Sequence, residues 1–197
     1  MKTVGSRSSG IARACAGALV LLCMSTGAFA GEAAQKAADA EALLAEGKVK
    51  QAVEAFDASA EAFWKAAPLT FRKVLFADDV KGYGEYAAHA GDVYAPGSEL
   101  KIYAEPVGFG WSSAESGHRI AFRAEIEIRN DKGVIFAKSP APAVLEKVSR
   151  SPSRDFHLTV AFALPAQLKP GNYRLLLTVT DEATGKSAPI ELPLTIS

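Results

Sequence analysis

Apolar and polar residues alternate strictly over residues 119–129, which predicts a β-strand with one buried and one solvated face. One side carries Ile120, Phe122, Ala124, Ile126 and Ile128, and the other carries Arg119, Arg123, Glu125, Glu127 and Arg129. The same two-residue period predicts strands at residues 71–77, 99–104, 134–137, 156–162, 173–179 and 190–196. Many short strands separated by Gly- and Pro-containing turns indicate an antiparallel sandwich of about seven strands over residues 68–197.

Turn and edge signals refine this sandwich. Residues 130–133 are Asn-Asp-Lys-Gly, and Gly133 suits the left-handed backbone conformation that a hairpin turn needs. Pro189 and Pro193 cannot donate ladder hydrogen bonds, so the strand at 190–196 is expected at a sheet edge. An exposed edge could accept a strand from another chain.

Before Pro68 the period is that of an α-helix. Residues 31–67 are rich in Ala, Leu, Glu, Lys and Gln, and Gly47 interrupts them, so the segment is expected to form a hairpin of two helices, Glu32–Glu46 and Lys48–Ala66. The second helix carries one apolar stripe, made of Val49, Ala52, Val53, Phe56, Ala60, Phe63 and Trp64. So short a hairpin cannot bury enough surface alone, and the stripe should be covered by the sandwich or by a partner.

Two short stretches resemble known families. Residues 47–52, with Phe56 and Ser59, resemble the second half of a tetratricopeptide repeat, in which small and aromatic positions let neighbouring helices nest. The stretch occurs once, whereas solenoids need about three repeats, which favours a lone hairpin. Residues 168–173, Leu-Lys-Pro-Gly-Asn-Tyr, resemble the tyrosine corner of fibronectin type III and immunoglobulin-like domains. That resemblance implies that the Tyr173 hydroxyl bonds to the upstream backbone.

The predicted fold class is therefore α+β, with an N-terminal α-helical hairpin followed by an antiparallel immunoglobulin-like β-sandwich. The cysteine pair of antibody-type domains is missing, so the resemblance concerns architecture and not activity. The whole chain also resembles secreted bacterial proteins of this layout.

Residues 1–30 have the features of a secretory signal peptide. Lys2, Arg7 and Arg13 precede a short apolar run that ends in Ala28-Phe29-Ala30, and cleavage is expected after Ala30. The product would be periplasmic or secreted, with no membrane span after cleavage.

Cleavage would change the composition. Removing 30 of the 197 residues leaves 167, and both cysteines and both methionines lie in the removed part. Disulfides and thiolate zinc sites are then excluded, and no cofactor is expected. Three of the 22 basic residues would also leave, which takes the formal net charge from 0 to −3. That charge is too mild to imply nucleic acid as a partner.

Sequence motifs of catalysis are missing. The chain has no H-E-x-x-H, G-x-S-x-G, P-loop or EF-hand pattern. His89, His118 and His157 are too widely spaced to indicate a metal site, and the adjacent Asp78 and Asp79 would point to opposite sides of an extended chain. A site assembled in space from distant residues stays open.

Aromatic residues in loops supply the candidate ligand site. Residues 80–91 contain Tyr83 and Tyr86 and look too broken by glycine to form a strand. In the strand at 99–104, Tyr103 and then Glu105 are expected on the outer side, and Trp111 follows in a loop. We expect Tyr83, Tyr86, Tyr103, Glu105 and Trp111 to converge in a surface cleft for a sugar ring or a peptide. The alternative is that these rings cover apolar surface of the sandwich.

Three functions are compatible with these features. The first is non-catalytic binding of an envelope protein, or self-association, through the helical stripe or the edge strand. The second is a carbohydrate- or peptidoglycan-binding module that uses the aromatic cleft. The third is a hydrolase with a spatially assembled acid/base pair.

Overall fold

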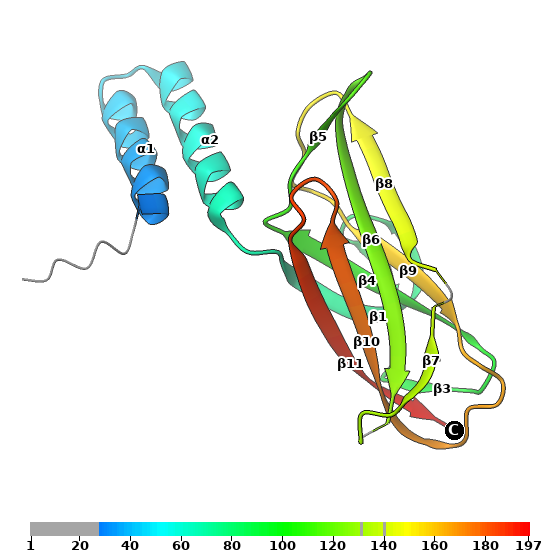
Figure 1. The fold of residues 1–197 in the computed structure, drawn as a ribbon. Helices are drawn as coiled ribbons and strands as arrows, with labels where there is room; N and C mark the ends of the chain where they lie inside the picture. Colours follow the sequence, from blue (N-terminus) through cyan, green and yellow to red (C-terminus); the bar gives the residue numbers. More distant parts are fainter. Residues whose placement is uncertain (1–27, 131, 140) are drawn as a thin grey trace, which may run out of the picture.

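The computed structural model describes residues 28–130, 132–139 and 141–197. The predicted signal peptide lies outside the described residues, apart from its last three positions. Within these ranges two helices are followed by eleven strands, and the helical hairpin stands beside a sandwich of two sheets (Figure 1). The predicted α+β fold, with a helical hairpin before a mostly antiparallel sandwich, is confirmed.

The hairpin consists of α1 (Ala28–Ala45) and α2 (Val49–Ala66). Gly47 makes the bend in the left-handed conformation, with φ +76°, and the amide of Lys48 donates to the carbonyl of Leu43 at 3.0 Å. Ala40 and Ala52 are buried in the hairpin, and the buried Ser59 hydroxyl donates to the carbonyl of Ala33 at 2.7 Å. Small side chains thus hold the two helices close together.

The first sheet has four strands in the order β2-β1-β4-β9. The second has seven, with the path β3-β11-β10-β6-β5, and β7 and β8 also pair with β6. All these pairs are antiparallel except β3 with β11. The strands are β1 (Thr70–Gly82), β2 (Glu85–Ala88), β3 (Val93–Tyr94), β4 (Glu99–Val107), β5 (Ser112–Ala114), β6 (Gly117–Arg129), β7 (Ile135–Lys138), β8 (Ala143–Ser149), β9 (Leu158–Ala163), β10 (Gly171–Asp181) and β11 (Ser187–Ile196).

The core lies between the two sheets and follows the alternation in the sequence. Its fully buried side chains include Leu100, Ile102, Ile120, Phe122, Ile128, Leu158, Leu175 and Leu177. The hydroxyl of Tyr173 donates to the carbonyl of Lys169 at 2.9 Å, so the expected bond to the upstream backbone is present. Gly133 adopts φ +78° in the turn before β7, as predicted.

The prediction of about seven strands was too low. Residues 80–91, expected to be too broken for a strand, contain the end of β1 and all of β2. Gly84, with φ +73°, lets the chain turn between β1 and β2. This glycine therefore forms the turn of a hairpin and does not prevent strand formation. β11 is an edge strand as expected, except that the short β3 pairs with Thr195 and Ile196.

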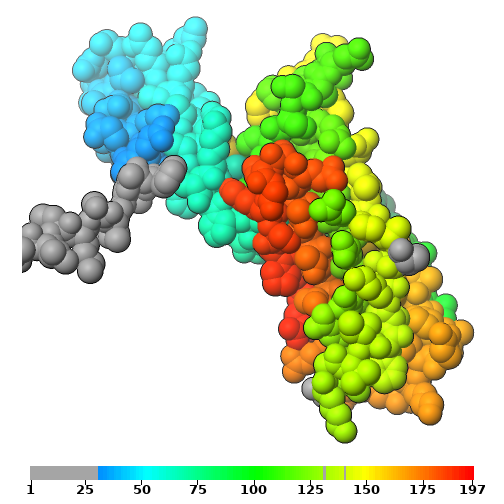
Figure 2. Space-filling model, in the orientation of Figure 1, coloured from blue at the N-terminus to red at the C-terminus, as the bar shows by residue number. Residues whose placement is uncertain are grey.

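The hairpin meets the sandwich at the C-terminal end of α2, next to the β10–β11 turn drawn in orange-red (Figure 2). The Trp64 indole N–H donates to the carbonyl of Phe109 at 2.8 Å. The Lys186 ammonium group, from the β10–β11 turn, donates to the carbonyls of Lys65, Ala67 and Gly108 at 3.0, 2.6 and 2.8 Å. We call these contacts the joint.

The buried carboxylate of Asp181 stabilises the loops that form the joint. The Asp181 side chain is fully buried and accepts hydrogen bonds from the amides of Gly110 and Ala183, at 2.8 and 3.0 Å, and from the Thr184 hydroxyl. It ties the β10–β11 turn to the loop that follows β4. The loop that contacts α2 is therefore held by charge-assisted hydrogen bonds.

Candidate functional site

The predicted cleft does not hold its five residues in one place. Tyr103 does lie on the outer face of β4, but its exposed fraction is 0%, and that of Glu105 is 8%. The Tyr86 ring, 4.4 Å from the Tyr103 ring between centroids, and the His157 ring, 5.6 Å away, pack against it. The expectation that Tyr103 and Glu105 are open to ligand is therefore wrong, because β2 and the segment before β9 cover them.

Internal hydrogen bonds occupy the polar groups of this cluster. The Tyr103 hydroxyl donates to a Glu105 carboxylate oxygen at 2.8 Å and accepts the Gly84 amide at 2.8 Å. Burial, with the Glu105 carboxylate adding to it, raises the pKa of Tyr103 to about 12. The Tyr83 hydroxyl accepts a bond from the Arg72 guanidinium at 2.7 Å. These contacts fit the alternative, in which the rings cover the sheet.

Trp111 lies with a different set of residues. Its ring stacks near that of Trp64, with centroids 6.4 Å apart and planes at 27°, and it also contacts Phe109 at 5.4 Å. Phe109 is buried and packs edge-on against Trp64 at 5.2 Å. The aromatic loop predicted around Trp111 therefore packs onto the end of α2, which the sequence did not indicate.

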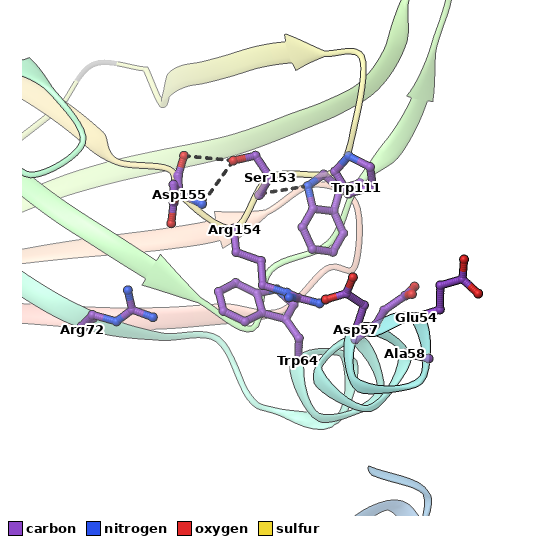
Figure 3. Close-up of a pocket in the computed structure, with 11 residues that line it drawn as sticks. Glu54, Asp57, Ala58, Trp64, Arg72, Trp111, Ser153, Arg154 and Asp155 are labelled. Atoms are coloured by element: carbon purple, nitrogen blue, oxygen red, sulfur yellow. Dashed lines mark hydrogen bonds between the residues drawn. The ribbon is translucent and has the colours of Figure 1, made fainter. Parts of the chain in front are cut away.

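A groove of about 900 Å³ opens between α2 and the sandwich at this point (Figure 3). Both tryptophans line it. The α2 side adds Glu54, Asp57, Ala58 and Glu61, and the sandwich side adds Arg72, Pro152, Ser153, Arg154 and Asp155. We call it the α2–sandwich groove. Its size falls within the range of small-molecule sites.

Charges in the groove are arranged around the tryptophans. The Arg154 guanidinium lies over the Trp64 ring, 5.7 Å from its centroid, and its buried Nε has no hydrogen-bond partner among the described residues. Glu54 and Glu61 pair with Lys50 and Lys65 of their own helix, at 3.9 and 2.6 Å. The hydrogen bond from Lys65 and its charge lower the pKa of Glu61.

The second candidate surface is the apolar stripe of α2. Trp64 and Ala52 are buried, but Val49, Val53, Phe56 and Phe63 have exposed fractions of 58, 55, 62 and 67%. Leu44 of α1 is also exposed. The stripe predicted from the sequence is thus present, and within the described residues neither α1 nor the sandwich buries these four exposed members. We call Val49, Val53, Phe56, Ala60 and Phe63 the free stripe.

A histidine–carboxylate pair lies at the far end of the sandwich. His89 Nδ1 is 2.6 Å from a carboxylate oxygen of Asp78, and the His89 ring stacks on Tyr94 with centroids 4.4 Å apart. The hydrogen bond to Asp78 raises the pKa of His89. Over the part of the chain that the structure covers, no group of three or more His, Cys, Asp or Glu residues could hold a metal ion. Nor does either helix have the length and apolarity that a membrane crossing requires.

Comparisons with known proteins show distant structural similarity. No family model and no curated protein matches the chain. A family 123 glycoside hydrolase from Clostridium perfringens matches with a TM-score of 0.37 and 13% identity, over 65% of this chain and 27% of its own. The C-terminal domain of wzt matches with a TM-score of 0.37 and 11% identity, over 68% and 76%. A chitin binding domain from Burkholderia pseudomallei matches with a TM-score of 0.31 and 13% identity, over 55% and 57%.

This chain spans about a quarter of the length of the glycoside hydrolase. At TM-scores this low, the similarities carry no argument about function.

Proposed function

We propose that this protein is a non-catalytic binding protein, exported to the periplasm or beyond, that holds a helix of another protein against the free stripe of α2. Export rests on the signal-like residues 1–30. The observation that carries the binding proposal is the row of large apolar side chains that the fold leaves more than half exposed. Burial of such water-exposed apolar surface against a partner is favourable in free energy.

The spacing of the free stripe favours a helical partner. Its residues follow one another at intervals of four, three, four and three positions, which is the spacing of a helix seam that packs against another helix. From Val49 to Phe63 the seam is about 21 Å long at the rise of an α-helix. A partner helix of about fifteen residues would cover it.

Charge beside the stripe disfavours a second copy of the chain. The free stripe extends seven positions to either side of Phe56, so two antiparallel copies would centre there and bring their Asp57 carboxylates together. Within the described residues Asp57 has no ion pair of its own. A partner helix with a basic residue next to its apolar seam would fit this edge of α2.

Peptide binding tests the proposal. Fluorescence anisotropy would measure the affinity of labelled amphipathic helical peptides with the matching seam, carrying either basic or acidic flanks. The peptide with basic flanks should bind, and Val53→Lys should weaken binding about tenfold or more, because it removes apolar contact and repels the flanks. Val144→Lys is the matched control, since Val144 on β8 is 58% exposed and Val53 is 55% exposed; it should leave the affinity unchanged.

Three outcomes would contradict the proposal. One is equal affinity for the peptides with acidic and basic flanks. The second is equal loss in Val53→Lys and Val144→Lys. The third is a stable dimer in light scattering that Val53→Lys dissociates, since the stripe would then be covered by a second copy.

A further inference from the structure

The α2–sandwich groove is separate from the free stripe and has a different lining. Its walls come from two units, with Asp57 and Trp64 on the helix and Trp111, Arg154 and Asp155 on the sandwich (Figure 3). The joint holds these walls at a fixed separation through Lys186 and the Trp64 indole. The groove is therefore a built feature of the fold and not a gap between loose parts.

The tryptophans offer ring faces and no spare donors. The indole N–H of Trp64 donates to Phe109, and that of Trp111 donates to the carbonyl of Ser153 at 3.3 Å. Arg154 lies over the face of Trp64, whereas Trp111 is only half-buried. Trp111 is thus the platform on which the flat, C–H-rich face of a ligand can stack.

The remaining charges in the groove balance. Glu54 and Glu61 each pair with a lysine of their own helix. Among the described residues no ion pair is found for Asp57, Asp155, Arg72 or Arg154, which leaves two negative and two positive groups around the tryptophans. A charged ligand would meet a like charge on one wall. A neutral ligand whose groups both donate and accept hydrogen bonds would satisfy both walls.

We propose that the α2–sandwich groove binds a neutral saccharide, which stacks on Trp111 and exchanges hydroxyl hydrogen bonds with Asp155 and Arg154. A sugar ring has an apolar C–H face that can stack on Trp111, and hydroxyl groups that can both donate to the carboxylates and accept from the guanidinium groups of the groove. The groove volume of about 900 Å³ accommodates several sugar units.

The composition of the chain makes this proposal easy to test. The sequence contains two tryptophans, Trp64 and Trp111, and both line the groove, so intrinsic tryptophan emission reports on this site alone. The purified protein would be titrated with neutral tetrasaccharides, namely cellotetraose, maltotetraose and the tetramer of N-acetylglucosamine. The cationic tetramer of glucosamine and the anionic tetramer of galacturonic acid serve as charge controls.

At least one neutral tetrasaccharide should change the emission in a saturable way, and more strongly than either charged tetramer. Asp155→Asn should weaken that binding about tenfold or more, the loss of one hydrogen bond to a charged group. Asp79→Asn, at an exposed carboxylate of β1 outside the groove, should not. Trp111→Ala should abolish binding, and its circular dichroism spectrum would show whether the fold is kept.

Specific results would overturn the proposal. They are no response to any neutral probe at about 10 mM, equal or stronger binding of a charged tetramer, or equal effects of Asp155→Asn and Asp79→Asn. The stripe and the groove can fail separately, because Val53→Lys should leave saccharide binding intact and Asp155→Asn should leave peptide binding intact.

Discussion

Removal of the Lys186 charge should loosen the joint between the hairpin and the sandwich. The Lys186 ammonium donates to three backbone carbonyls, two at the C-terminal end of α2 and one at Gly108. The α2 carbonyls have no further helical turn to bond with, and a cation there also meets the negative end of the helix dipole. In Lys186→Met the apolar stem is kept and only these interactions are lost.

The expected cost follows from the three contacts. A hydrogen bond to a charged group contributes about 1.5–3 kcal/mol net, but the Lys65 and Ala67 carbonyls can be resolvated by water once the ammonium is gone. Gly108 is buried, so water cannot readily replace the hydrogen bond that its carbonyl loses, and this contact accounts for most of the cost. Together this gives a loss of about 2–3 kcal/mol in the free energy of unfolding. With a urea dependence of about 2 kcal/mol per molar, the midpoint should fall by about 1 M.

Urea unfolding followed by tryptophan emission is the suitable assay, because Trp64 and Trp111 both lie beside the joint. Lys81→Met is the matched control, since Lys81 is exposed on β1 and its side chain makes no hydrogen bond or ion pair among the described residues. It should shift the free energy by less than about 0.5 kcal/mol. Equal midpoints for the two variants would refute the role of Lys186 in holding the joint.

Two further predictions concern backbone space and pH. Gly108→Ala should cost well over twice as much stability as Gly133→Ala in thermal denaturation. Both glycines have φ near +80°, but a Cβ at Gly108 would lie 2.4 Å from the Pro68 carbonyl oxygen, whereas one at Gly133 meets nothing within 4 Å. Gly133→Ala should lose only about 1–2 kcal/mol of stability, and equal losses in the two variants would contradict this prediction. Because the His89 pKa is raised, the pair with Asp78 stabilises the fold fully below the unfolded-state pKa of about 6.5 and loses this effect as the pH rises through the folded-state pKa. Asp78→Asn should lower the His89 pKa in an NMR titration, and an unchanged pKa would show that the carboxylate is not the cause.

Periodicity predicted the fold because burial on one side of a helix or strand leaves a local trace in the sequence. The alternation around Ile120 and Tyr173 and the stripe around Phe56 needed no knowledge of distant residues. The strands that were missed lack that trace. In β8 most residues are exposed, with Val144 and Val148 among them, so no alternation between dry and wet sides was present to detect.

The candidate sites depend on contacts between residues that are far apart in the sequence and that no local pattern connects. Tyr103 was placed on the correct side of its strand, but its cover comes from Tyr86 and His157, which lie on other strands and segments. Trp111 was recognised as a possible ligand contact, and its actual neighbours are Trp64 of α2 and the segment around Arg154. Neither partner shares a period with Trp111, so only the tertiary fold brings them together.

The two proposed surfaces use different sides of one helix. Ala52 and Ser59 face α1, Trp64 with Asp57 faces the groove, and Phe56 stays free, so each residue type matches the partner on its side. Small residues allow the close helix–helix approach, and polar and aromatic residues suit a wet groove. Large apolar residues on the remaining side serve neither purpose within this chain. Their exposure to water is unfavourable and would be relieved by burial against a partner, which is the physical basis of the proposal that this side binds a helix.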